Sequence, residues 1–121
     1  MHDDRGLEDV WETYVRSWNA TTPEERRVLF ENSLDPGCVY RDPLIRAEGW
    51  DALIAYILDF QRQVAGGRFV TRYFMDYGDQ SIARWDMQGA DGSVLGDGIS
   101  YGEYGPDRKL VRMTGFFETP R

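Results

Sequence analysis

The start of the chain places apolar and polar residues with the period of an α-helix. Apolar side chains recur at steps of three, one and three residues, and acidic and polar side chains occupy the opposite face. The apolar stripe consists of Leu7, Val10, Trp11, Tyr14, Val15 and Trp18. This pattern predicts an amphipathic helix that packs against a core through the stripe.

A second helix is predicted to begin at Thr22. This residue is a favourable N-cap, Pro23 suits the first helical position, and Glu25 completes a capping box. The apolar positions that follow carry the helix to about Leu34, where the sequence Asp35-Pro36-Gly37 is expected to stop it.

A short extended run over residues 38–41 precedes Asp42-Pro43. The proline forbids continuation of a helix and pushes Asp42 towards an extended backbone. After a loop, a third helix is expected to begin at Gly49 and to end at Gly66-Gly67. Its apolar face would contain Leu53, Ile54, Ile57, Leu58, Gln61 and Val64.

From residue 68 onward the period changes to two, which is typical of β-strands. Turn sequences at Gly78-Asp79, Asp91-Gly92 and 105–107 divide this region into four predicted strands. They cover residues 68–77, 81–89, 94–104 and 109–118, and Phe69, Thr71, Tyr73, Met75 and Tyr77 are expected to share one face. Glycines in the third strand (Gly96, Gly98, Gly102) indicate bulges or strong curvature.

Three helices followed by an antiparallel meander indicate an α+β fold, in which a curved sheet packs against helices. The hollow between such layers is a common place for a small ligand. A length of 121 residues favours a single domain over residues 1–121.

The composition of the chain excludes several classes of partner and of catalytic site. The chain has 14 Lys and Arg against 21 Asp and Glu, a formal net charge of −7, which disfavours nucleic acids and anionic membranes as partners. The single cysteine, Cys38, cannot form an internal disulfide, which suits the reducing cytoplasm. The single histidine, His2, leaves no histidine-based metal site or Ser-His triad. We therefore expect no metal and no organic cofactor, and chemistry based on carboxylates, hydroxyls and arginine.

The order of elements and several local sequences resemble the nuclear transport factor 2-like superfamily, which includes ketosteroid isomerases and SnoaL-like polyketide cyclases. The similarity extends over residues 7–118 and is carried by the sequence Val39-Tyr40-Arg41-Asp42-Pro43, by Gly49, by Trp85 and by the hairpin at 104–110. The resemblance implies a cone-shaped, curved antiparallel sheet wrapped around N-terminal helices.

The resemblance also implies roles for individual residues. Isomerase members carry a catalytic Asp just before a Pro, which matches Asp42, and a first-helix Tyr that donates to the enolate oxygen, which matches Tyr14. Their third catalytic group is a protonated Asp, and the matching position here is Ser100. This departure weakens the second oxyanion donor and counts against steroid isomerisation in particular.

Asp42 is also a candidate base on physical grounds. A carboxylate in a dry pocket becomes more basic, and a tyrosine hydroxyl beside it can donate to a developing oxyanion. The alternative is that Asp42 only satisfies backbone donors of the turn ahead of Pro43. Tyr14 likewise has an alternative as a core residue whose hydroxyl lies at the sheet edge.

An aromatic wall for a flat apolar ligand is a further prediction. Its candidates are Trp85, Phe117, Met113, Tyr56, Phe60 and Trp50, with Ser100 among the substrate-binding residues. All of them have core packing as the alternative. Asp97 lies among the glycines, where a kink could turn it inward to face Asp42 across a water molecule, an arrangement that suggests hydrolysis. Arg46 and Arg84 are expected to be solvated or interface charges.

Apolar residues are also expected on the outer face of the sheet, at Val70, Phe74, Ile82 and Ile99. Such a face tends to pack against a second sheet, which predicts a two-fold homodimer, and the resemblance implies the same.

Two functions remain open. One is an isomerase, cyclase or hydrolase acting on a small apolar substrate with Asp42 as base. The other is a non-catalytic module that binds an apolar ligand or a partner protein.

Overall fold

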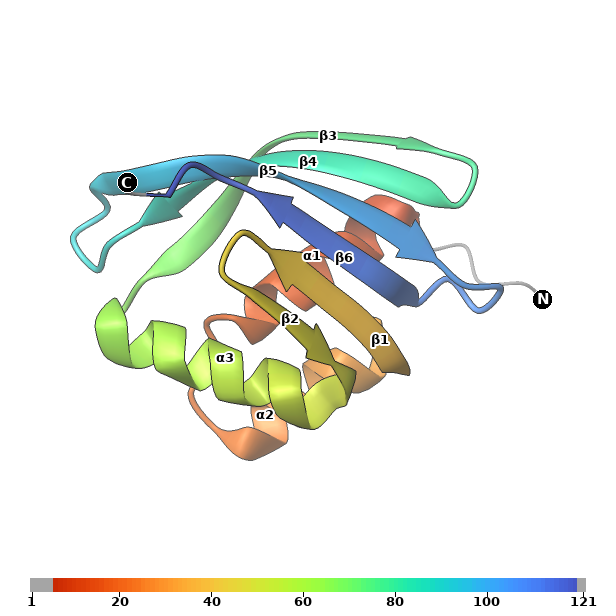
Figure 1. Cartoon of the computed structure of the whole chain (residues 1–121), viewed down its shortest axis with the longest axis horizontal. Coiled ribbons are helices and arrows are strands. Elements are labelled where there is room, and N and C mark those ends of the chain that lie inside the picture. The colour runs from red at the N-terminus through yellow and green to blue at the C-terminus, as the bar shows by residue number, and fades with distance from the viewer. Residues whose placement is uncertain (1–5, 120–121) are drawn as a thin grey trace.

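The computed structural model describes residues 6–119 and contains three helices packed on a curved sheet (Figure 1). The elements are α1 (Leu7–Ser17), α2 (Pro23–Glu31), β1 (Leu34–Asp42), β2 (Ile45–Glu48), α3 (Gly49–Gln63), β3 (Arg68–Tyr77), β4 (Gln80–Gln88), β5 (Val94–Tyr104) and β6 (Leu110–Phe116). The helices cover the concave side of the sheet. The hairpin of β3 and β4 forms the edge of the sheet that lies opposite β2 (Figure 1). The α+β prediction is confirmed.

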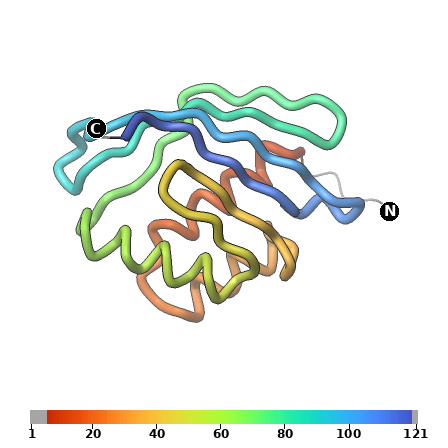
Figure 2. The backbone as a smooth tube through the Cα atoms, viewed as in Figure 1, coloured from red at the N-terminus to blue at the C-terminus, as the bar shows by residue number. Residues whose placement is uncertain are grey.

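One sheet of six strands has the order β2-β1-β6-β5-β4-β3. The predicted meander from β3 to β6 is present, and all neighbouring strands are antiparallel except β1 and β6, which are parallel. The tube in Figure 2 shows how this parallel pairing brings the yellow β1 beside the dark blue β6. The first strand of the chain and the last one therefore lie side by side within the sheet.

The predicted stripe of α1 is buried. Val10, Trp11 and Tyr14 are at most 4% exposed, and Trp18 follows directly after the last turn. The stripe packs into one apolar cluster with residues from every later part of the chain, among them Phe30, Leu34, Leu53, Ile57, Leu110 and Met113. The core thus lies between α1, α3 and the concave face of the sheet.

The second helix is shorter than the sequence predicts. Its start is correct, since Thr22 Oγ1 accepts from the Glu25 N–H at 3.1 Å. Its end at Leu34 is wrong, because the helix stops at Glu31 and Leu34 is the first residue of β1, fully buried and paired with Leu110. The turn sequence at 35–37 lies inside β1, where the register with β6 shifts.

The predicted loop before the third helix is also wrong, because residues 45–48 form the short strand β2 against β1. Four residues carry too little periodicity to show a strand in the sequence. The start of α3 at Gly49 is confirmed, and this glycine has a φ of 83°, a conformation that side chains disfavour.

A bulge at Arg72 changes the faces of β3. Thr71 pairs with Trp85 and Tyr73 with Arg84, so that one extra residue stands in β3. Phe69 and Phe74 consequently both pack on the core. The predicted outward position of Phe74 is wrong, and so is the predicted sharing of one face by Phe69, Tyr73, Met75 and Tyr77. Val70, Ile82 and Ile99 pair with outward residues, as predicted.

The glycines of β5 lie on the concave face, opposite inward residues of β4. A Cβ atom at Gly98 would stand 2.4 Å from Trp85 Cζ2 and 2.6 Å from the carbonyl oxygen of Phe116. The indole of Trp85 therefore lies directly on the bare backbone of β5, which only glycine permits. None of the helices in the described part of the chain is both long and apolar enough to cross a bilayer.

This close approach gives a matched pair of glycine substitutions. Gly98→Ala should displace Trp85 and cost about 1 to 3 kcal/mol in the free energy of unfolding. Gly96→Ala, on the same strand and face, should cost less, since its Cβ meets only Met87 Cε at 3.7 Å. Urea unfolding with near-ultraviolet circular dichroism measures both, and equal costs for the two variants would contradict the packing described.

Candidate ligand site around Asp42

Four hydrogen bonds converge on the carboxylate of Asp42. Its Oδ2 accepts from the hydroxyls of Tyr40 at 2.6 Å and Tyr56 at 2.7 Å. Its Oδ1 accepts from the backbone N–H of Leu44 at 2.8 Å and of Ile45 at 3.2 Å. One oxygen therefore shapes the turn between β1 and β2, and the other gathers two phenols.

Local structure explains how these groups meet. Tyr40 and Asp42 are two residues apart on β1, so both side chains point to the concave face. Tyr56 reaches them from the middle of α3, and its ring lies 5.7 Å from that of Tyr40. Asp42 and Tyr56 are half-buried, whereas Tyr40 is only 8% exposed. The carboxylate thus stands at the boundary between core and surface.

The phenols of this region are strongly held in their protonated form. Burial raises the pKa of Tyr40 far above its usual range, and the nearby phenol of Tyr14 and the hydrogen bond to Asp42 raise it further. Burial and the hydrogen bond to Asp42 also raise the pKa of Tyr56. Burial similarly raises the pKa of the Cys38 thiol, to about 11. The site consequently presents neutral hydroxyls around a single carboxylate.

Tyr14 lies close to this cluster but is not one of the donors to Asp42. It is 4% exposed, and burial is the main reason that its pKa is raised, with smaller effects from Cys38, Asp42 and Tyr56. The two tyrosines that hydrogen-bond to Asp42 were not predicted in that role. Tyr40 could have been found from the sequence, because residues two apart on a strand share a face.

Most of the predicted aromatic wall forms a continuous chain of ring contacts across the concave face. Trp18 contacts Tyr56, Phe60 and Phe69 at centroid distances of 5.9, 5.7 and 5.4 Å. Phe69 contacts Trp85 at 5.1 Å, and Trp85 contacts Phe117 at 6.3 Å. Met113 lies beneath this layer, 1% exposed and paired with Tyr40. The rings of Tyr56, Trp85 and Phe117 are half-buried, and we call these three residues the aromatic rim.

Ser100 lies beside the aromatic rim, on the strand next to Gly115. Its Oγ accepts the indole N–H of Trp85 at 3.0 Å, so the hydroxyl proton of Ser100 is left to donate elsewhere. Between Ser100 and Asp42 lies Gly115, where an added Cβ would meet Asp42 Cβ at 3.5 Å, Tyr40 Oη at 3.6 Å and Ser100 Oγ at 3.8 Å. The bare backbone of Gly115 forms the floor between the polar groups.

Other candidate residues lie apart from Asp42. Asp97 points to the outer face, 3.8 Å from Arg84 and 63% exposed, so a water held between Asp42 and Asp97 is ruled out. Arg46 pairs with Glu48 at the surface. Trp50 donates to the carbonyl oxygen of Asp35 at 3.0 Å and lies near Phe30, away from the other rings of the wall.

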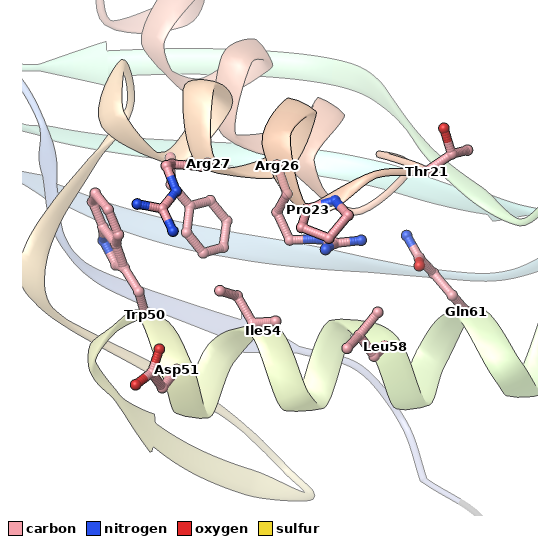
Figure 3. Close-up of a pocket in the computed structure, with 10 residues that line it drawn as sticks. Thr21, Pro23, Arg26, Arg27, Trp50, Asp51, Ile54, Leu58 and Gln61 are labelled. Carbon is pink, nitrogen blue, oxygen red and sulfur yellow. The ribbon is translucent and has the colours of Figure 1, made fainter.

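Two hollows of the described residues stand out, and neither of them is lined by Asp42. The larger, of about 460 Å³, lies between α2 and α3, and Trp50 is the only predicted ligand residue in its wall (Figure 3). The smaller, of about 360 Å³, lies between α1 and β3. At Asp42 the aromatic rings pack against one another.

Comparison with known proteins places the fold. No family model matches the chain, and no curated protein matches it either. Several solved structures do match the chain. A candidate isomerase of the SnoaL-like family from Agrobacterium tumefaciens has a TM-score of 0.85 at 24% identity, over 93% of this chain and 97% of that one. A nuclear transport factor 2-like protein of unknown function from Exiguobacterium gives 0.73 at 18%, over 92% and 99%. TerC, co-crystallised with polyporic acid, gives 0.69 at 14%, over 90% and 91%.

The raised pKa of Tyr40 predicts a loss of stability in alkali. The unfolded chain releases this proton near pH 10, whereas the folded state keeps it, so the stabilisation is complete below about pH 10 and declines above it. Each such tyrosine lowers the free energy of unfolding by about 1.4 kcal/mol per pH unit in that range. Urea unfolding from about pH 9 to 11 should show a shallower decline for Tyr40→Phe than for the unchanged protein. Parallel declines would contradict the assignment.

Proposed function

We propose that this chain, which has the nuclear transport factor 2-like fold, is a cofactor-independent enzyme that moves a proton on a small apolar molecule at the Asp42 rim. The observation that carries the proposal is the pair of tyrosine hydroxyls on Asp42 Oδ2, at 2.6 and 2.7 Å, beside a rim of aromatic rings. Structures with the same fold include a candidate SnoaL-like isomerase, which supports an isomerase or cyclase class of reaction.

The geometry suggests how substrate binding could activate the base. Tyr56 is half-buried and reaches Asp42 from a separate helix, so its hydroxyl can turn towards a carbonyl oxygen that enters the rim. Asp42 Oδ2 would then lose one donor and be free to accept a proton, while the same phenol stabilises the developing oxyanion. Tyr40 and the two backbone amides would hold the carboxylate in place meanwhile.

The transfer is balanced within the substrate. Asp42 takes a proton from a carbon next to the carbonyl group, the electron pair moves to the carbonyl oxygen, and Tyr56 donates a hydrogen bond to that oxygen. Return of the proton from Asp42 to another carbon gives an isomer. Attack of the enolate carbon on a second carbonyl group of the same molecule gives a ring, and the alkoxide formed there takes the proton back from Asp42. Tyr14, predicted as the donor, would support this set from the buried side.

A non-catalytic binding module is the second candidate, and one observation favours it. Asp42 Oδ1 is occupied by the N–H groups of Leu44 and Ile45, which is the structural role that the sequence analysis offered as the alternative. In that case the aromatic rim would hold an apolar ligand, and Asp42 would only fix the turn. Asp42→Asn separates the two candidates.

We also propose that the outer face of the sheet forms a homodimer. Its exposed apolar residues are Tyr73, Met75, Ile82, Ile99 and Phe116. Cross-strand pairing places Ile99 beside Phe116 and Ile82 beside Met75, so that two apolar pairs lie on the outer face of four neighbouring strands. We further propose a cytoplasmic location, since the single cysteine, Cys38, cannot form an internal disulfide, which suits a reducing compartment.

The base assignment can be tested with 5-nitrobenzisoxazole, a flat aromatic compound whose activated C–H bond breaks when a base removes the proton. The N–O bond then opens and releases a coloured phenolate, so no other reactant is needed. Asp42→Asn should lower kcat/KM by about 100-fold or more, since general base catalysis contributes about 10² to 10⁴. Absorbance of the phenolate gives the rates.

Asp59→Asn is the matched control. It makes the same Asp-to-Asn change on α3, where the Asp59 side chain pairs with Arg62 at the surface. Its rate should equal that of the unchanged protein. Equal rates for Asp42→Asn and Asp59→Asn would refute the base assignment. Quenching of tryptophan fluorescence by the compound, without turnover in any variant, would favour the binding module.

The dimer predicts a change of mass on mutation of the outer face. Ile99→Glu places a charge in the centre of the apolar patch and should convert a dimer into a monomer in sedimentation equilibrium. Val28→Glu makes a similar change on α2, where the side chain is 54% exposed, and should leave the dimer intact. A monomeric unchanged protein would refute the proposal.

A further inference from the structure

The groove between α2 and α3 has the size and walls of a ligand site that is separate from Asp42. Its volume of about 460 Å³ falls within the range of about 300 to 1,000 Å³ that is usual for small-molecule sites. Figure 3 shows Arg26 and Arg27 entering it from α2, opposite Ile54, Leu58 and Gln61 of α3.

Arg26 is an unusual member of this wall because its charge is buried without a counterion. The residue is 4% exposed, and Nη2 donates to the carbonyl oxygen of Ala20 at 3.1 Å. Its Nε is buried and has no hydrogen-bond partner, and no carboxylate of residues 6–119 pairs with it. A guanidinium has five N–H donors, and burying it unpaired is costly.

The surroundings of Arg26 fix its position. The carbonyl oxygen of Ala20 that accepts from Arg26 also accepts from Gln61 Nε2 at 2.9 Å, so that the two side chains are tied to one backbone atom. Gln61 Nε2 donates a second hydrogen bond to the carbonyl oxygen of Trp18 at 3.0 Å. The guanidinium is therefore held at the groove by the fold and does not extend into solvent.

Charge and polarity vary along the groove. Arg26 and Gln61 lie towards one end, whereas Asp51 lies beside Trp50 at the other, where Arg27 of α2 supplies an opposite charge (Figure 3). Between them the walls are formed by Phe30, Ile54 and Leu58. A ligand that matches this arrangement carries one negative group at the Arg26 end and an apolar body that stops short of Asp51.

We propose that this groove binds a small monocarboxylate with an apolar body, with its carboxylate on Arg26 and its body against Ile54 and Leu58. A carboxylate can accept two parallel N–H bonds from a guanidinium, which satisfies the buried charge. The site shares no residue with the Asp42 rim, so either proposal can fail without the other.

The test compares octanoate with 1-octanol, which have the same chain but differ in charge. Titrations followed by ¹H–¹⁵N NMR should place both on the amides of α2 and α3, with octanoate at least tenfold tighter than octanol. In Arg26→Met, an apolar residue of similar length, the ratio should fall to about one. An unchanged ratio in Arg26→Met, or no binding of octanoate to the unchanged protein, would overturn the proposal.

Two further comparisons keep the test decisive. Arg62→Gln removes the same charge from α3 outside the groove, where the side chain is 69% exposed, and should leave the ratio unchanged. If the ratio of octanoate to octanol affinity falls equally in Arg62→Gln and Arg26→Met, the preference for octanoate comes from surface charge alone, and the proposal is overturned. If Arg26→Met does not fold, Leu58→Glu and Leu58→Gln replace it. Octanoate should bind the Glu variant at least tenfold more weakly than the Gln variant, and equal affinities would contradict the site.

Discussion

A carboxylate at the edge of a core must have its oxygens hydrogen-bonded, and Asp42 meets this requirement through three different parts of the chain. Its oxygens join the turn that follows β1, the buried Tyr40 of the same strand and Tyr56 of α3. The same bonds fix the β1–β2 hairpin and hold α3 against the end of β1. They also set two phenols beside the aromatic rim. Local structure and candidate chemistry thus depend on one side chain.

The curvature of the sheet decides what surrounds that carboxylate. The glycines of β5 let Trp85 lie on the backbone at Gly98, and the bulge at Arg72 turns both Phe69 and Phe74 to the concave side. These aromatic side chains fill the concavity, so the rim at Asp42 is a packed surface whose half-buried members must part for a ligand. The helices leave a different space open, the groove at Arg26, where a cation is buried with no counterion among residues 6–119.

The sequence predicted best where periodicity and turn chemistry agree. The stripe of α1, the Thr22 cap and the Asp91-Gly92 hairpin each depend on neighbouring residues, and the structure has all three. The end of α2 was missed because long-range pairing of Leu34 with Leu110 outweighs the local signals, and β2 was missed because four residues carry too little periodicity. The inward turn of Phe74 was missed because a bulge shifts the alternation. Of the candidate site, Asp42 came from the Asp-Pro sequence, whereas Tyr56 as its partner needs a contact across 14 residues.

Proton NMR of the tyrosine hydroxyls, with and without the flat aromatic ketone 1-indanone, tests the proposed exchange at Asp42 most directly. Without ketone, one exchange-protected hydroxyl resonance should be lost in Tyr40→Phe and a different one in Tyr56→Phe. With ketone, the Tyr56 resonance should move and the Tyr40 resonance should stay, because only Tyr56 leaves the carboxylate. If the ketone binds at Trp85 and both hydroxyl resonances remain unchanged, Asp42 keeps both phenols and does not act as a substrate-activated base.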